Sequence, residues 1–365
     1  MNRSIALPTV RRDSQRIHGR LTTPRVLQGG LLLLLLAVVM ASVGIGAVGI
    51  SPAQVVSILL QQIGVDLGVS FGANQSGVLL GVRLPRVLLG VLVGGALGAA
   101  GAAMQGLFRN PLADPGLIGV SSGCALGAVL CIVVGHAIFP AFLDQFGMYA
   151  LPVAAFVGGL SATLLVYRIS ARSGMRSVST MLLAGIAVNA LAGAAIGLCT
   201  YLATDAQLRN LTFWSLGSLA GGTWRTLAVV ALPIVLTLLL LPRFARQLNM
   251  LALGEGEAAH LGVSINQLKW RVTGLCALAV GASVSMTGLI GFIPLIAPHL
   301  VRLTIGPDHR YLIPCSTLLG AVLLVAADLA SRTVVAPAEL PIGIITAIVG
   351  APFFLWLLIR EQRIA

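Results

Sequence analysis

The stretch NMLALGEGEAAHLGVS, residues 249–264, is polar, contains several glycines and separates two strongly apolar runs. The run before it covers Leu227–Leu241, and the run after it covers Val272–Ile290. Long uncharged apolar runs indicate helices that lie in a bilayer. The stretch is therefore predicted to be a water-facing connection between two membrane helices.

A short helix is expected inside this connection. Gly254 and Gly262 bracket seven residues, EGEAAHL, which make about two helical turns. Glu255 and Glu257 lie at the start, where the helix dipole favours negative charge, and His260 lies near the end. Gly262 suits the left-handed residue that terminates many helices. Such a capped helix either docks another protein or lies against the membrane, and the residues alone leave both readings open.

The composition is that of a membrane protein. Of the 365 residues, 57% are hydrophobic and only 9% are charged, whereas soluble domains carry about 25% charged residues. Apolar stretches of about 20 residues recur from end to end, each long enough to cross ~30 Å of hydrocarbon as a helix. The predicted fold class is an all-α polytopic membrane protein with about ten transmembrane helices and no sizeable soluble domain.

The predicted organisation is a basic tail, residues 1–25, followed by one transmembrane domain, residues 26–363, with a polar loop at 243–268. The apolar run Val26–Ile50 is too long for a signal-peptide core, so we expect a retained first span. The spans are expected near residues 26–49, 84–106, 117–139, 149–168, 178–202, 226–242, 270–290, 291–303 (short or broken), 311–331 and 340–360.

The basic residues orient these spans. An even number of spans puts both termini on one side, and a cytoplasmic N-terminus leaves most of the 23 Lys and Arg inside, as the positive-inside rule requires. This distribution explains the net charge of +12 without nucleic-acid binding. The Lys and Arg expected on the outer side are Arg83, Arg86, Arg209, Arg225 and Arg332.

The stretch MTGLIGFIPLIAPHLVR, residues 286–302, is interrupted by two glycines and two prolines. A helix broken inside a bilayer is tolerated where protein or a water-lined cavity satisfies the freed backbone, so this stretch indicates a pathway or a gate. Generic packing is the alternative for each candidate, and for His299 a structural hydrogen bond. The pathway or gate candidates are Met104, Asn189, Met286, Pro294, Pro298 and His299.

Other polar and small residues have plainer interpretations. A glycine at every fourth position from Gly90 to Gly98 predicts a close helix contact. Asp328 is expected to pair with Arg332 one turn later. The five cysteines show no metal-ligand spacing and are interpreted as packing residues, so no metal site is predicted.

Several long motifs follow one another along the chain. They are RLPR (83–86), GAAMQGLFRNPLADPGLIGVSSG (101–123), LALGEGEAAHLG (251–262), GFIPLIAPHLVR (291–302), DHR (308–310) and AELPIGIITAIVGAPFFLWLLIR (338–360). Together they resemble the FecCD-type permeases, the membrane subunits of type II ABC importers for ferric siderophores, haem and vitamin B12. The resemblance runs from about residue 26 to 363. One departure is Pro294, where that family usually has Gly-Leu after the Phe.

The resemblance implies a type II importer permease fold in a homodimer with the pathway between the subunits. It also implies two cytoplasmic ATPase subunits, which hold ATP and Mg, and a periplasmic substrate-binding protein. Arg83, Arg86 and Arg332 are then expected to meet carboxylates of that binding protein. The coupling residues that would sit against the ATPase are Leu251, Leu253, Gly254, Glu255, Glu257, Ala258, His260, Leu261 and Gly262.

The expected function is therefore that of a non-enzymatic permease subunit in the bacterial inner membrane, importing an iron complex and holding no permanent cofactor. The chain itself has no P-loop, because its only lysine, Lys269, follows a leucine. Haem is preferred as the substrate over a ferric siderophore, with cobalamin third. An ion-coupled secondary transporter is the alternative, although it would need membrane carboxylates and only Asp328 is available.

Overall fold

The computed structural model describes residues 23–172 and 178–362, so residues 1–22 of the predicted basic tail lie outside the described residues. Every regular element within those ranges is a helix, which confirms the predicted all-α class. Six of the described helices are long and apolar enough to cross a membrane.

The predicted spans each correspond to a helix, although two of these helices are short. They are α1 (Pro24–Gly44), α4 (Leu84–Phe108), α5 (Val120–Val133), α8 (Ala150–Arg172), α9 (Val178–Leu202), α11 (Trp224–Leu240), α14 (Ile265–Thr287), α15 (Ile293–Ile305), α16 (His309–Thr333) and α17 (Ile342–Gln362).

Shorter helices connect the spans. They are α2 (Pro52–Gln61), α3 (Ala73–Val78), α6 (Gly135–Ile138), α7 (Pro140–Phe146), α10 (Asp205–Ser215), α12 (Ala245–Leu251) and α13 (Glu255–His260), with the 3-10 or π turns η1 (Leu79–Arg83), η2 (Pro115–Ile118), η3 (Gly147–Tyr149) and η4 (Leu241–Phe244).

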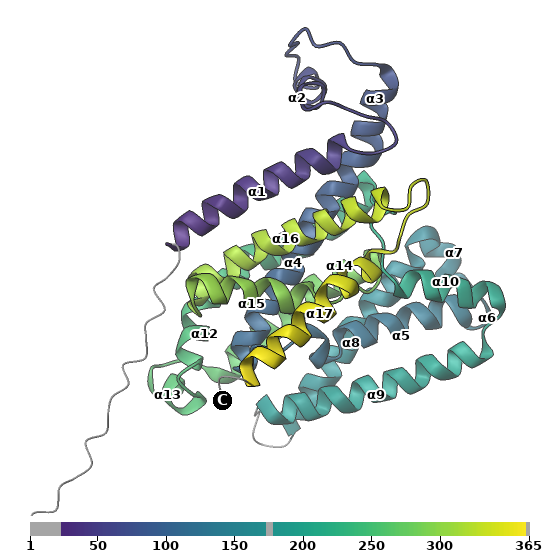
Figure 1. Ribbon diagram of the computed structural model, residues 1–365. Coiled ribbons are helices and arrows are strands. Elements are labelled where there is room, and N and C mark those ends of the chain that lie inside the picture. The colour runs from purple at the N-terminus through teal and green to yellow at the C-terminus, as the bar shows by residue number, and fades with distance from the viewer. Residues whose placement is uncertain (1–22, 173–177, 363–365) are drawn as a thin grey trace, which may run out of the picture.

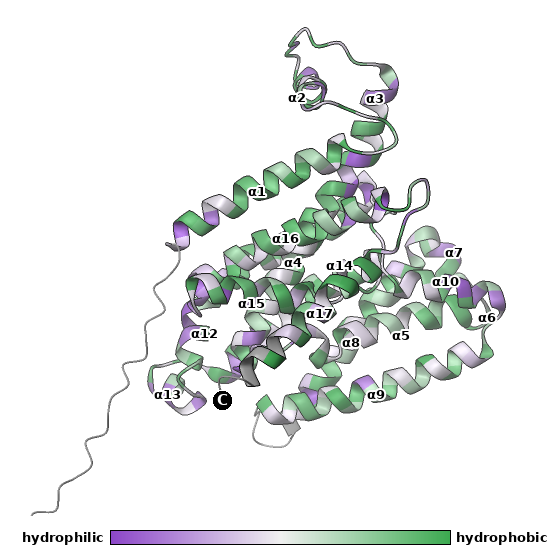
Figure 2. Ribbon diagram, viewed as in Figure 1, coloured by the Kyte–Doolittle hydropathy of each residue, from purple (hydrophilic) through white to green (hydrophobic). Residues whose placement is uncertain are grey.

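The helices form two groups joined by α14 (Figure 1). In one group α4 packs against α16, and α16 packs against α1. In the other, α5 packs against α8 and α9. Helix α14 contacts both α4 and α8. At one end of the molecule α2 and α3 project from the bundle, and α13 lies at the opposite end (Figure 1). Green apolar residues dominate the long helices in Figure 2.

Local structure departs from the sequence pattern in two places. The composition of FGANQSG, residues 71–77, is typical of a turn, but α3 and η1 continue directly into α4. The π turn η1 precedes Pro85, which has no N–H for the regular helical bond and so favours a local change of hydrogen-bonding pattern. The span predicted at 117–139 is also shorter than expected, because Gly119 (φ +83°) separates η2 from α5 and α5 ends at Val133.

The glycine pattern of α4 does bring helices close together, as predicted. A Cβ on Gly94 would overlap the carbonyl oxygen of Gly320 in α16, and a Cβ on Gly98 would overlap that of Ser316. Gly320 is itself pressed against the Gly94 carbonyl. Small residues permit this contact because dispersion between closely packed backbones replaces the hydrophobic effect that is missing in lipid.

Three non-helical segments meet where α14 ends. The Ser218 N–H donates to Thr287 O (2.7 Å), so the segment after α10 satisfies the end of α14. The same segment accepts from the start of α17, since Gly217 O receives the Ile342 N–H (3.1 Å) and Leu216 O receives the Gly343 N–H (2.9 Å). Irregular backbone is thereby satisfied within the protein, as a bilayer requires.

Candidate functional site

Helix α13 has the capped geometry that the sequence predicted. Gly254 (φ +126°) precedes it, and Gly262 (φ +86°) follows it in the left-handed region. The N–H of Gly262 donates to Ala259 O and that of Val263 to Ala258 O, at 2.9 and 3.0 Å. These bonds satisfy carbonyls at the helix end, so the turn is well defined.

One side of α13 is fixed to the rest of the chain. Ala258 and Leu251 are fully buried. The Glu255 carboxylate accepts hydrogen bonds from Lys269 Nζ in α14 at 2.8 and 2.9 Å. Lys269 is only 1% exposed, so Glu255 neutralises a buried cation. Glu255 therefore holds α13 to α14, although its side chain remains 32% exposed.

The other side of α13 is open to solvent. Leu253 and Leu261, which flank the helix, are 67% and 57% exposed. Glu257 and His260 are also exposed. Two exposed leucines beside charged groups on a rigid element are typical of a protein docking surface. Of the predicted coupling residues, the structure thus separates Glu255, Leu251 and Ala258, which anchor the helix, from those that a partner could touch.

A second group of polar hydrogen bonds lies where α12 contacts the start of α16. Asn249 donates to Asp308 Oδ1 (2.7 Å) and accepts from the His309 N–H (2.9 Å). Asp308 caps α16 through the Arg310 N–H and pairs with the Arg310 guanidinium (2.7 Å). The hydrogen bonds from Arg310 lower the Asp308 pKa to about 2. The sequence motif DHR is therefore a helix cap tied to α12.

The opposite end of the bundle carries the arginines that were expected to dock a binding protein. Arg83 is 6% exposed, and its guanidinium donates to Val43 O (2.7 Å), Gly44 O (3.0 Å) and Val48 O (2.6 Å). These carbonyls belong to the end of α1 and the residues after it. Arg83 therefore neutralises the negative end of the α1 dipole.

Arg86 is held by two carboxylates. It is 7% exposed and pairs with Asp328 of α16 (2.9 Å). Two of its nitrogens also donate to Glu339, both at 2.9 Å, which is a bidentate pair. The Arg86 guanidinium lowers the pKa of Glu339.

Arg332 completes this arginine cluster, which we define as Arg83, Arg86, Asp328, Arg332 and Glu339. Its Nε lies 3.2 Å from Asp328 Oδ2, which confirms the predicted pairing within α16. Its Nη2 also donates to Ser42 O in α1 at 2.7 Å. All three docking candidates are therefore engaged by the chain itself.

The broken helix is held by α4. Pro298 lies inside α15 and cannot donate to Pro294 O, the partner that regular helical geometry would give it. The amide of Gln105 donates to that carbonyl instead (3.4 Å), and Gln105 Oε1 accepts from Arg302 (2.8 Å). A Cβ on Gly101 would overlap the same carbonyl. The freed backbone is thus satisfied by protein.

The remaining pathway candidates do not line one common space. Met104 is fully buried in α4. Asn189 of α9 donates to Gly116 O and accepts from the Ser122 hydroxyl, so it joins α9 to η2 and α5. The ring of His299, which is 7% exposed, packs against Phe353 with the ring centroids 6.3 Å apart.

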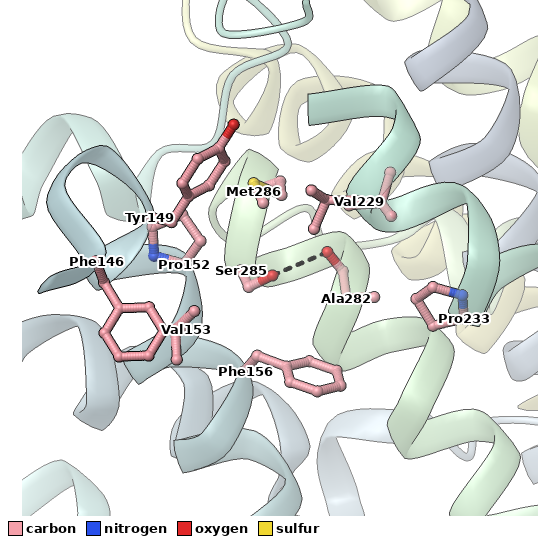
Figure 3. A pocket seen from close by; sticks show the side chains of 11 residues that line it. Phe146, Tyr149, Pro152, Val153, Phe156, Val229, Pro233, Ala282, Ser285 and Met286 are labelled. Carbon is pink, nitrogen blue, oxygen red and sulfur yellow. Dashed lines mark hydrogen bonds between the residues drawn. The ribbon is translucent and has the colours of Figure 1, made fainter. Parts of the chain in front are cut away.

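Met286 lines an apolar cavity of about 340 Å³ between α8, α11 and α14 (Figure 3). The Ser285 hydroxyl in its wall donates to Ala282 O (3.0 Å) and so is already satisfied. Aromatic and aliphatic side chains make up most of the remaining wall. A cavity of this kind offers contacts to apolar groups and little to a charged ligand. Its lining residues are Phe146, Tyr149, Pro152, Val153, Phe156, Val229, Val230, Pro233, Ala282, Ser285 and Met286.

The described fold, with its bundle of apolar helices, its satisfied helix break and its rigid polar helix at one end, defines a helical membrane permease. The chain belongs to the FecCD transport family, whose model matches residues 33–360.

Known relatives agree with this assignment. The chain is 44% identical over 347 residues to the hemin transport system permease protein HmuU of Yersinia pestis, covering 95% of this chain and 99% of that protein. It is 41% identical over 283 residues to the vitamin B12 import system permease protein BtuC of Vibrio cholerae, covering 77% and 82%. A metal-chelate type ABC transporter, solved in an inward-facing conformation, superposes with a TM-score of 0.79 at 34% identity, covering 92% and 99%.

Sequence reasoning missed three partners. Glu339 was quoted only inside a family motif, Lys269 only as proof that no P-loop exists, and Asn249 only as the first residue of the opening stretch. Lys269 did carry a signal, because a lone lysine near an apolar run needs a carboxylate, and Glu255 is the first acid of the preceding loop.

Proposed function

We propose that the chain is the membrane subunit of an ABC importer that moves an iron complex, haem, from the periplasm to the cytoplasm. The observation that carries this proposal is the near full-length similarity to a hemin permease, with 44% identity across 99% of that protein. The subunit lies in the bacterial inner membrane with both termini in the cytoplasm, because that orientation places most basic residues inside.

The proposal assigns the energy source to a separate ATPase that binds Mg-ATP and docks on α13. Leu253, Glu257 and Leu261 offer the exposed contacts, while Glu255 and Lys269 transmit force from α13 to α14. A helix fixed on one side and exposed on the other moves as a rigid body when a partner pushes it. Movement of α14 would then reach the segments that meet at Thr287.

Two copies of the chain, two ATPases and one periplasmic binding protein would form the working importer, with the pathway between the two copies. The arginine cluster supports docking at the periplasmic end because it contains three cations and two carboxylates. Arg83 and Arg86 are buried and all three arginines have partners within the chain, so a binding protein would have to compete for them. The net positive charge of the cluster would still orient an acidic partner and speed its encounter.

The substrate is tested by uptake into proteoliposomes that contain this chain, its ATPase and its binding protein. Haem, a ferric siderophore and cobalamin are offered separately, with ATP inside. Uptake of haem alone supports the proposal, whereas uptake of the siderophore or cobalamin alone replaces haem with that substrate. The vitamin B12 relatives, 41% identical, make cobalamin a necessary comparison.

The same vesicles separate an ABC importer from an ion-coupled transporter. Uptake by an ABC importer requires ATP and continues after the ion gradient is collapsed. Uptake by an ion-coupled transporter requires the gradient and continues without ATP. Asp328 is the residue on which ion coupling would depend, and it is already paired with Arg86 and Arg332. We therefore expect uptake to require ATP.

A further inference from the structure

The Arg86 guanidinium pairs with two carboxylates in the arginine cluster, and one of these two partners is exposed. The Asp328 side chain is 1% exposed, whereas the Glu339 side chain is 42% exposed. Glu339 lies on the segment 334–341 between α16 and α17, and its two carboxylate oxygens accept from two nitrogens of Arg86. The pair therefore joins an almost fully buried arginine to a carboxylate that solvent can reach.

The segment that carries Glu339 leads directly into the junction of irregular backbone. The Leu340 N–H donates to Ser331 O (3.0 Å), and the Ser331 hydroxyl donates to Leu340 O. Two residues later the first turn of α17 donates to the segment after α10, through Ile342 and Gly343. A displacement of Glu339 would therefore be passed to the start of α17, which begins at Ile342.

We infer that Glu339 is an internal competitor for the docking site: its carboxylate occupies Arg86 until an acidic side chain of the docked protein takes its place and frees the segment 334–341. This inference rests on the proposed docking of a binding protein at the arginine cluster. The occupant must be an acid, because the guanidinium is shaped for a bidentate carboxylate. Asp328 stays with Arg86 and Arg332 throughout, since it is buried and a partner cannot reach it.

The exchange is balanced in charge. One carboxylate replaces another on Arg86, so no buried cation is left without a counterion, which would be costly. The cluster carries one more positive than negative charge, which attracts an acidic surface before the exchange occurs. The freed Glu339, already half-exposed, is hydrated by the solvent it faces.

The test replaces Glu339 and measures capture of the substrate-binding protein of the same import system by the chain in nanodiscs. Glu339→Gln removes the competing charge and keeps the size of the side chain. We expect it to bind the binding protein about threefold or more tightly than wild type, with a steeper loss of binding as salt is raised. Glu339→Asp keeps the charge and should stay near wild type. Asp66→Asn is the matched control, because Asp66 is an exposed acid between α2 and α3 that bonds only its own turn.

A second measurement needs no partner. Hydrogen exchange of the Leu340, Ile342 and Gly343 amides should be faster in Glu339→Gln than in Asp66→Asn, because the segment has lost its attachment to Arg86. The double variant Arg86→Gln, Glu339→Gln should lose the gain in capture, because the gain depends on a free Arg86.

The outcomes separate this inference from the docking role. If wild type captures the binding protein and Glu339→Gln captures it no more tightly, or less tightly, then Glu339 does not compete for Arg86. The docking role of the arginine cluster would remain. Absence of capture in wild type and variants alike overturns both. Unchanged exchange of the Leu340, Ile342 and Gly343 amides also overturns the competitor, because Glu339 would then not hold the segment. A purely structural role for Glu339 predicts weaker capture, the opposite of our expectation.

Discussion

At the scale of single residues, the two acids that begin α13 have different roles despite their similar positions in the sequence. Glu255 pairs with the buried Lys269, and Glu257 faces solvent. Glu257→Arg should therefore reduce ATP-driven uptake while the melting temperature stays within about 2 °C of wild type, because exposed substitutions change stability by ±0.5 kcal/mol or less. Normal uptake in this variant would count against docking at α13.

Glu255→Arg is expected to differ from Glu257→Arg in stability as well as uptake. It would place a second cation against buried Lys269, and a broken buried pair costs about 3–5 kcal/mol. Partial exposure of Glu255, 32% for its side chain, places the expected cost below that range. Thermal unfolding of both variants in the same detergent checks the difference, and equal melting temperatures would mean that the Glu255–Lys269 pair contributes little.

Asp308 gives a pH dependence with a defined sign. Its folded pKa is about 2, below the ordinary value near 3.9, because Arg310 bonds its ionised form. The stabilisation is therefore complete above about pH 4 and is lost as the pH falls through about 2. Asp308→Asn should unfold more readily than wild type at pH 6, and the difference should shrink towards pH 2. A difference that persists undiminished at pH 2 would show that the charge of Asp308 is not its cause.

At the scale of helices, the contact between α4 and α16 depends on glycine. Gly94→Ala should destabilise the protein by about 1–3 kcal/mol, the usual cost of overpacking, because its methyl group would overlap the Gly320 carbonyl. Gly274→Ala in α14 is the matched control, since nothing lies within 4 Å of its Cβ position. The control should be neutral or more stable by up to about 1 kcal/mol, because alanine is the better helix former. Denaturation in mixed micelles measures both, and a stable Gly94→Ala would show that the two helices can separate without loss.

Sequence reasoning succeeded where one local rule decides the outcome. The positions of Gly254 and Gly262 correctly predicted the ends of α13, and the glycines of α4 predicted a close helix contact. The spacing of Asp328 and Arg332 predicted their ion pair. It failed where the partner is distant in the chain. Asp328, one of the carboxylates that bind Arg86, lies 242 residues further along the chain. No local sequence pattern reveals that the docking arginines are engaged internally. The helical start of α4 was also missed, because FGANQSG is as compatible with a turn as with a capped helix.

At the scale of the whole molecule, α14 extends from α13 to the junction at the far end, and α12 and α16 form a second route between them. Lys269 lies near its start and bonds Glu255, and Thr287 at its end accepts from Ser218. Force applied to α13 can thus reach the segments after α10 and before α17 without passing through lipid. We expect the connection to depend on the Lys269–Glu255 pair, because this ion pair joins α13 to α14.

Lys269→Met tests this connection. It preserves an unbranched side chain of similar length and leaves Glu255 unpaired, where its partly exposed carboxylate can be hydrated. We expect the assembled importer to hydrolyse ATP at near the wild-type rate but to import several-fold less substrate per ATP, because docking persists while α14 no longer follows α13. Uptake and phosphate release are measured in the same proteoliposomes, with Gly274→Ala as the control that alters α14 elsewhere. An unchanged ratio of substrate to ATP would show that the pair only stabilises the loop, and that movement reaches the junction through α12 and α16 instead.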